Sequence, residues 1–548
     1  MSVDVEANQE LPDETPHETI ALESDAAAQD DMSVARATGV VALGNIVSRV
    51  LGLGRMMLLS DLFGAGIAVD AFNVAVIVPK TLFDLLIGGH VNSALVPVLS
   101  EYAMQKDRNV LWQLVNMLLG MVIVILALLV LVLELLAPQV VSLIAGNAVP
   151  EIQELATNLL RITTPALMFL SVFAVLSGLL YALRRFTLPA FAGALFNASI
   201  VIVTLLFAPT LGITAMAVGW LVGAFVQMSA QLLGLRDARL RPTLRRVWAE
   251  PGVRRIVLLY IPVMFSLIID TMVIRLVSYR LAAQVGPASI SYMEFATTLI
   301  QFPHGLVATA ISIAILPTLS RQAVLISTDG AGVYKDTLGR GLRLAIVLII
   351  PATIGLFVIA PALVGLLFEH GSFTTIDTAY TALALRLYLF GLPFAAVDLL
   401  LVFAFYSQQD TLTPALIGVI SLVAYMAVAL SLMPRFGLFS LMIADSIKHM
   451  LHASIAAWLL SRRIGGLKGQ QITVTTGKTL AAALVMGVAV YFAQVILLGV
   501  APANILGEIL VVGMAALAGV LVYVVMAGVL RIGELYWMGR LIRDRLGC

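Results

Sequence analysis

Charged residues are scarce in this sequence, and cysteine is almost absent. Only 12% of the 548 residues are charged and 60% are hydrophobic, and the mean hydropathy is +1.01. A soluble globular protein of this size needs more polar surface than this composition supplies. The composition therefore excludes a soluble globular protein and predicts a polytopic membrane protein. The single cysteine, Cys548, excludes an internal disulfide framework and a metal site built from several cysteines.

Motifs for catalysis and nucleotide binding are also missing. The sequence has no Gly-rich phosphate loop, no cluster of His and Glu at metal-binding spacing and no nucleophile elbow. We therefore expect no enzymatic activity, no ATP hydrolysis, no cofactor, no metal and no nucleic-acid partner. His90 and His304 have the titration range for proton coupling. Each lies near a predicted span end or a break within a span, where a solvated histidine is common, so we expect neither to be essential.

Apolar runs follow one another between residues 38 and 530. A membrane-spanning helix needs roughly 20 mostly apolar residues. By that measure we place fourteen spans, at 38–60, 67–92, 111–136, 155–182, 188–208, 211–234, 253–283, 288–320, 341–368, 378–406, 412–433, 437–461, 476–499 and 504–530. The expected fold class is an all-α polytopic membrane protein.

The charges of the connecting loops predict an orientation. Lys and Arg concentrate in cytoplasmic loops of membrane proteins. Here they gather after even-numbered spans and in the C-terminal tail, whereas loops after odd-numbered spans have almost none, apart from Arg435. Both termini are therefore predicted to be cytoplasmic. Residues 1–32 contain acidic side chains and no Lys or Arg, which predicts a disordered acidic tail.

Two stretches of the sequence repeat at a constant offset. YALRRFTLP begins at Tyr181 and YSQQDTLTP at Tyr406, and the prolines of PTLG and PRFG stand at Pro209 and Pro434, so both pairs are 225 residues apart. A weaker match links LVPVLSEY with ILPTLSRQ. Each copy follows an even-numbered span, which predicts two parallel lobes around a central cavity, as in alternating-access transporters. The alternative is an old duplication with no moving parts.

The first span contains two arginines, in SRVLGLGR. Ser48, Gly52 and Arg55 follow one another on one helix face at steps of four and three, and Arg49 flanks that face. A charge inside the bilayer is costly unless it faces water or a partner, and an arginine fork binds phosphate or carboxylate bidentately. The face therefore predicts the wall of an anion-binding cavity. The alternative is that Arg49 or Arg55 snorkels to the interface or pairs with Asp61 or Asp70.

Other charged residues within the predicted spans are candidates for the same cavity. Arg275 follows Asp270 by five residues, a poor spacing for a pair on one helix face. These two either join the cavity, with Arg275 as a third anion contact, or neutralise each other across a helix contact. The acidic or coupling candidates are Asp70, Asp84, Asp270 and Glu294. The expected cavity lining includes Ser48, Gly52, Lys80, Thr297 and Thr298.

Several motifs together resemble one known family. The motifs are, in chain order, SRVLGLGR, FGAGIAVDAF, LVPVLSEY, ISYMEFATTLIQFPHGL, AILPTLS, LLFEHGSFT and AFYSQQDTLTP. They are similar, in this order, to motifs of the MurJ (MviN) lipid II flippases. That family belongs to the multidrug, oligosaccharidyl-lipid and polysaccharide (MOP) exporter superfamily, which includes MATE transporters. The similarity covers about residues 33–465. It implies a fourteen-helix transporter of the bacterial plasma membrane, active as a monomer, that moves undecaprenyl-pyrophosphate-linked peptidoglycan precursor from the inner to the outer leaflet.

The resemblance also divides the chain. In that family helices 1–2 and 7–8 line a central cationic cavity, and helices 13 and 14 form a groove for the lipid tail. It implies an N-lobe at 33–240, a C-lobe at 241–465, a lipid-tail groove at 466–530 and a basic cytoplasmic tail at 531–548. Carried over by motif, the family's two arginines in S-R-x-L-G-F-x-R fall on Arg49 and Arg55, and the aspartate of T-D-A-F falls on Asp70.

The chain departs from the family at two places in the expected cavity. After the proline of the second span it reads KTLFDLLIGG where the family has N-L-L-R-R-L-F-A-E-G, so Phe83 and Asp84 replace two arginines. Thr297 and Thr298 replace the Asp-Arg pair of Y-A-D-R-L-M-E-F-P. Lys80 is a candidate to compensate for the lost positive charge.

Three functions follow as hypotheses. The leading one is a lipid-linked oligosaccharide flippase for lipid II, in which Arg49, Arg55 and Arg275 bind the pyrophosphate and the membrane potential or an ion gradient drives alternating access. The lost arginines favour a second, an exporter of another polyprenyl-linked glycan or an amphipathic drug. The third is a transport-inactive scaffold that recruits envelope-synthesis enzymes through its acidic tail and basic loops.

Overall fold

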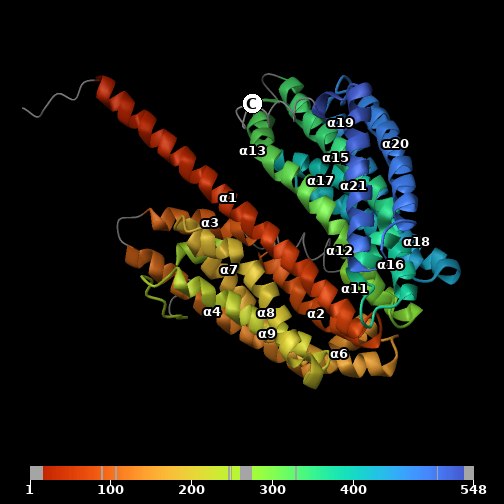
Figure 1. The fold of residues 1–548 in the computed structure, drawn as a ribbon. Coiled ribbons are helices and arrows are strands. Elements are labelled where there is room, and N and C mark those ends of the chain that lie inside the picture. Colours follow the sequence, from red (N-terminus) through yellow and green to blue (C-terminus); the bar gives the residue numbers. More distant parts are fainter. Residues whose placement is uncertain are drawn as a thin grey trace, which may run out of the picture.

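The structure, a computed structural model, describes residues 16–87, 90–104, 108–244, 247, 250–258, 274–326, 330–502 and 504–535. Every regular element in these ranges is helical, which confirms the all-α fold class. Helices α1–α9 build one lobe and helices α11–α21 build the other (Figure 1).

The N-lobe is built around long helices that pack closely. Its elements are α1 (Pro16–Phe63), α2 (Ile67–Ile87), α3 (His90–Ala103), α4 (Arg108–Leu135), α5 (Ala137–Ala145), α6 (Pro150–Thr163), α7 (Ala166–Ala182), α8 (Thr187–Leu211) and α9 (Thr214–Leu233). Helix α1 packs along α8, where a Cβ added to Gly44 would lie 2.3 Å from the carbonyl oxygen of Ala190. Glycine at this position therefore lets the two backbones approach, as small residues do in membrane helix pairs.

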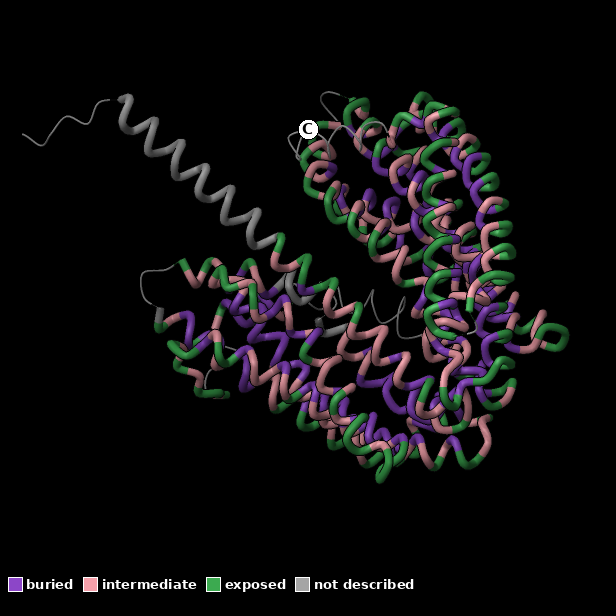
Figure 2. The backbone as a smooth tube through the Cα atoms, in the orientation of Figure 1, coloured by how far each residue is buried: buried purple, intermediate pink, exposed green. Residues whose placement is uncertain are grey.

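Within the described residues, the C-lobe contains the longest apolar helix, α15, as well as one span that is bent between two helices, α16 and α17. Its elements are α11 (Ile274–Val285), α12 (Ser289–Pro303), the π-helix η3 (His304–Thr309), α13 (Ala310–Val324), α15 (Gly332–Phe368), α16 (Thr375–Leu389), α17 (Leu392–Ser407), α18 (Leu412–Phe436), α19 (Phe439–Ile464), α20 (Ile472–Leu498) and α21 (Ile505–Val529). Helices α20 and α21 pack on α15. Much of the surface of α20 and α21 is exposed (Figure 2). The exposed side chains are largely apolar, and Leu484 and Leu521 are examples.

Most predicted spans coincide with helices that can cross a bilayer. Within the described ranges, ten helices or helix runs are long and apolar enough, and eleven if the pair α16–α17, bent by 45°, counts as one span. Three predicted spans remain. Spans 67–92 and 437–461 fall on α2 and α19, and span 253–283 falls largely on residues outside the described part of the chain. The polytopic helical architecture is confirmed, and the number fourteen stays a prediction.

The element boundaries differ from the expectation at three places. Helix α1 begins at Pro16, ahead of the predicted start of the first span at residue 38. Helix α3, which carries LVPVLSEY, continues the second span beyond residue 92. The short helix α5 follows α4 where we expected a loop, and Pro138 stands in its first turn, where proline is tolerated.

The backbone confirms the internal repeat. Arg184 and Gln409, which are 225 residues apart, both take left-handed conformations with φ of 56° and 60° at the turn that follows α7 and α17. Gly212 and Gly437, at the same offset, have φ of 57° and 53° where α8 and α18 end. Equal backbone conformations at equal sequence spacing show that both lobes contain the same helix-turn-helix unit.

The two lobes meet at one end of the molecule and diverge at the end where the C-terminus lies (Figure 1). At the closed end the N–H of Ser372 donates to the carbonyl of Asp61 at 2.8 Å, so the loop before α16 contacts the end of α1. Asp70 of α2 is buried and accepts hydrogen bonds from the N–H and hydroxyl of Ser291, at 2.8 and 2.5 Å. A carboxylate from one lobe therefore caps the N-terminus of α12 in the other lobe.

Candidate functional site

A polar cavity lies between the lobes and consists of two chambers. The chamber on the N-lobe side, here the N-chamber, has a volume of about 450 Å³ and lies among α1, α2, α8, α9 and α12. The chamber on the C-lobe side, here the C-chamber, has a volume of about 340 Å³ and lies among α2, α11, α12, η3, α17 and α19. Lys80, Glu294 and Gln301 line both chambers.

The structure places Arg49 and Arg55 on the wall of the N-chamber. Arg49 donates from Nη1 to the carbonyl oxygen of Gln301 at 3.3 Å, so it reaches across from α1 to α12. The Arg55 guanidinium lies 5.7 Å from the ring centroid of Trp220, a cation–π contact. Among the residues that the structure describes, no carboxylate forms an ion pair with either arginine.

Three residues of the N-chamber wall have a side-chain donor without a hydrogen-bond partner within the described ranges. The donors are Asn73 Nδ2, Trp220 Nε1 and Gln227 Nε2, all buried. Buried polar groups in proteins are nearly always hydrogen-bonded, and an unmade bond costs about 1–3 kcal/mol. Together with Arg49 and Arg55, these residues make the wall of the N-chamber rich in hydrogen-bond donors, which suits an oxygen-rich anion.

The C-chamber has a different electrostatic character, because each of its lysines and arginines has an acidic partner. The pairs are Lys80 Nζ with Glu294 Oε2 at 3.6 Å, Arg275 Nη1 with Asp84 Oδ2 at 3.0 Å, and Lys448 Nζ with Asp445 Oδ1 at 2.5 Å. Glu294 also accepts a hydrogen bond from the hydroxyl of Tyr279 at 2.7 Å. Arg275, predicted to be a third anion contact, is thus paired with Asp84, one of the residues that replace a family arginine.

The other predicted site residues lie at various distances from the chambers. Ser48, Gly52 and Asp84 line the N-chamber. Thr298 lines the N-chamber and Thr297 the C-chamber, but their hydroxyls donate to the carbonyls of Glu294 and Met293 in the preceding helix turn. Asp70 lies at the closed end and lines neither chamber. Asp270 and the side chain of His90 are outside the described residues, whereas His304 lines the C-chamber.

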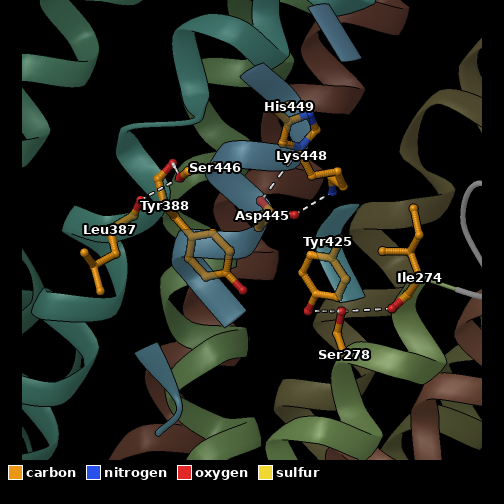
Figure 3. Close-up of polar contacts among 9 residues, drawn as sticks. All are labelled: Ile274, Ser278, Leu387, Tyr388, Tyr425, Asp445, Ser446, Lys448 and His449. Atoms are coloured by element: carbon orange, nitrogen blue, oxygen red, sulfur yellow. Dashed lines mark hydrogen bonds and ion pairs between the residues drawn. The ribbon is translucent and has the colours of Figure 1, made fainter. Parts of the chain in front are cut away.

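The sequence prediction missed three C-chamber residues, all on α19. Asp445, Lys448 and His449 occupy one face of that helix, and Figure 3 shows the carboxylate of Asp445 between the other two side chains. His449 Nε2 lies 3.8 Å from Asp445 Oδ2. The signal was the spacing D-x-x-K-H inside a predicted span, which places all three residues on neighbouring turns of one face.

Comparisons with known proteins agree with this geometry. The family model described as "Lipid II flippase MurJ" matches residues 59–510. A protein of Haemophilus influenzae named "Probable lipid II flippase MurJ" is 30% identical over 465 residues, which cover 82% of this chain and 90% of that protein. "Lipid II flippase MurJ" of Burkholderia cenocepacia is 30% identical over 400 residues, which cover 71% of this chain and 76% of that protein.

Solved structures share the fold. A lipid II flippase MurJ in an inward closed conformation superposes with a TM-score of 0.74 at 22% identity, covering 89% of this chain and 98% of that chain. An inward-facing multidrug resistance MATE family transporter of the MOP superfamily gives a TM-score of 0.62 at 15% identity, covering 77% of this chain and 95% of that chain.

Proposed function

The chain belongs to the MurJ family of lipid II flippases, and from this we propose that its N-chamber binds the pyrophosphate of a lipid-linked peptidoglycan precursor during transfer between the membrane leaflets. The protein is a multi-pass membrane protein that acts as a transporter and not as an enzyme. The observation that carries the proposal is that Arg49 and Arg55 line the N-chamber and form no ion pair with any described carboxylate, while the donor-bearing side chains of Asn73, Trp220 and Gln227 line the same chamber. A pyrophosphate offers several oxygen acceptors to such a set, and arginine binds two of them at once.

The direction of loading follows from the loop charges. The basic loops lie at the end where the lobes diverge, which makes that end cytoplasmic under the positive-inside rule. A headgroup from the inner leaflet then enters between the lobes, while the contacts of Asp61 and Asp70 keep the opposite end closed. Transport requires that those contacts open after the pyrophosphate binds, in an alternating-access cycle.

The driving force in this proposal is the membrane potential. An anionic headgroup that leaves a cytoplasm of negative potential gains about 2.3 kcal/mol per elementary charge for each 100 mV. No cofactor is needed for that step. The lipid tail stays in the bilayer against the exposed apolar faces of α20 and α21, and a single copy of the chain contains both chambers.

Reconstitution tests the function itself. The purified protein in proteoliposomes is expected to move sugar-radiolabelled lipid II to the opposite leaflet, and the same gene is expected to restore growth of a bacterium depleted of its own flippase. Protein-free vesicles are the control for spontaneous movement. Translocation no faster than in those vesicles, together with failed complementation by a correctly inserted protein, contradicts lipid II as the substrate.

Gly305 at the start of η3 tests the position of Arg49. A Cβ at Gly305 would lie 2.4 Å from Arg49 Nη2, so Gly305→Ala is expected to push the guanidinium away from Gln301. We expect translocation to fall about 10-fold, because a small displacement of a binding group weakens its contacts, while the melting temperature stays the same. Gly477→Ala, where the added Cβ meets open space, is the control. Unchanged translocation by Gly305→Ala contradicts a role for this position of Arg49.

A further inference from the structure

The two chambers differ in what they can bind. Within the described residues, Arg49 and Arg55 of the N-chamber form no ion pair, whereas Arg275 and Lys448 of the C-chamber, and Lys80, which lines both chambers, are each paired with a carboxylate. A second phosphate group in the C-chamber would meet the carboxylates as well as the cations, so this chamber is a poor site for an anion. Its volume of about 340 Å³ is nevertheless enough for a further part of a polar headgroup.

The ion pair of Asp445 and Lys448 does not tie helices together, although Lys448 Nζ also lies 6.0 Å from the ring centroid of Tyr425 on α18. Both residues belong to α19 and are three positions apart, so their bond joins no two helices. By contrast, Arg343 of α15 pairs with Glu534, which follows α21, and so ties distant parts of the C-lobe together. A pair at this spacing stabilises a helix by only about 0.2–0.5 kcal/mol, which is small against the cost of placing two charges within a membrane domain.

The pair is also open to the chamber. The side chains of Lys448 and Asp445 are 12% and 25% exposed, and both line the C-chamber together with His449. In Figure 3 the carboxylate of Asp445 lies within reach of Lys448 and His449, whose nitrogen atoms approach it at 2.5 and 3.8 Å. A ligand that enters the chamber therefore meets an ammonium and a carboxylate side by side.

The complementary ligand is a group that also carries one charge of each sign. A free amino-acid group has an ammonium and a carboxylate on one carbon atom, so it can exchange partners with the protein: its ammonium binds Asp445 and its carboxylate binds Lys448. Such an exchange replaces one buried ion pair by two, and no charge is left without a partner. A purely anionic ligand would leave Asp445 unpaired.

We propose that Asp445 and Lys448, with His449 beside them, form a subsite for a free amino-acid group in the peptide part of the substrate headgroup. This inference rests on the proposed function, because the pyrophosphate in the N-chamber is what brings the peptide to the C-chamber. The subsite makes transport depend on the charge state of the peptide. The N-chamber contacts alone would accept any pyrophosphate-linked glycan.

The test compares two substrates that differ only at the amino group. One is lipid II whose peptide carries a free amino-acid group, and the other is the same lipid with that amine acetylated; both are radiolabelled in the sugar, which leaves the peptide unmodified. In proteoliposomes the wild type is expected to transport the free-amine lipid about 10-fold faster, since a site that hydrogen-bonds a group rejects the analogue that lacks it. Asp445→Asn is expected to lose this preference by slowing the free-amine lipid alone.

Lys448→Gln provides the second arm. A third substrate is needed for this arm, namely the free-amine lipid II with the carboxylate of the same amino-acid group converted to an amide. Lys448→Gln is expected to slow the lipid with the free carboxylate about 10-fold and to move the amidated lipid as fast as the wild type does. Equal transport of both amine forms by the wild type overturns the subsite while leaving the proposed function intact. An equal loss on both substrates in Asp445→Asn also overturns it, because that pattern shows a structural role. A wild type that moves neither lipid refutes the proposed function, and with it this inference.

Discussion

Replacing Arg55 with Ala is expected to lower the translocation of lipid II by about 10-fold to 100-fold. Each hydrogen bond to a charged group contributes about 1.5–3 kcal/mol, and the loss of one such bond already corresponds to about that range of rates. The effect is large because Arg55 lies against Trp220 and has no ion-pair partner in the described part of the chain. No described carboxylate contacts the guanidinium, so its charge is available to the pyrophosphate.

Arg55→Lys separates charge from geometry. Lysine keeps the positive charge but cannot bind two oxygens in a planar fork, so this variant is expected to retain an intermediate rate. Arg462→Ala is the matched control, because Arg462 stacks on Trp458 at 4.0 Å and lines neither chamber. The measurement is the initial translocation rate in proteoliposomes with equal amounts of folded protein. A rate of Arg55→Ala equal to that of the wild type, or an equal loss in Arg462→Ala, contradicts the assignment.

The arginines of the N-chamber could be predicted from the sequence because their signal is local. A charge within an apolar run must face a cavity or a partner, and helical steps place Arg55 on one stripe with Ser48 and Gly52, which Arg49 flanks. The repeat was visible for the same reason. Its turn residues recur at a fixed spacing in the sequence, and the backbone at Arg184 and Gln409 takes the same left-handed conformation at both turns.

The partners of the cavity residues could not be predicted, because they come from distant segments. Arg275 pairs with Asp84, which lies 191 positions away on another lobe, and no spacing rule connects them. Asp70 was a candidate for the cavity on the same grounds as Asp84, yet it caps α12 at the closed end. Which acid faces a cation and which faces a helix N-terminus is decided by the packing of the lobes.

Oxidation of the double variant Asp70→Cys, Ser291→Cys is expected to stop transport almost completely. The hydroxyl of Ser291 lies 2.5 Å from the carboxylate of Asp70 in the present structure, so the two side chains are close enough for a disulfide when both are replaced. The bond would join α2 to α12 and hold the closed end shut. If the headgroup leaves through that end, a permanent closure blocks the cycle after loading.

The scarcity of cysteine makes this experiment clean, since only Cys548 has to be replaced by serine beforehand. The Asp70→Cys substitution by itself removes the cap of α12, which costs about 0.5–2 kcal/mol of stability. The readout is therefore the ratio of translocation rates before and after reduction of the same sample, because this ratio isolates the effect of the disulfide. Each single cysteine variant is the control and is expected to be insensitive to oxidant. Full transport by the cross-linked protein would mean that the two lobes need not separate at Asp70, and that the headgroup takes another route out of the chambers.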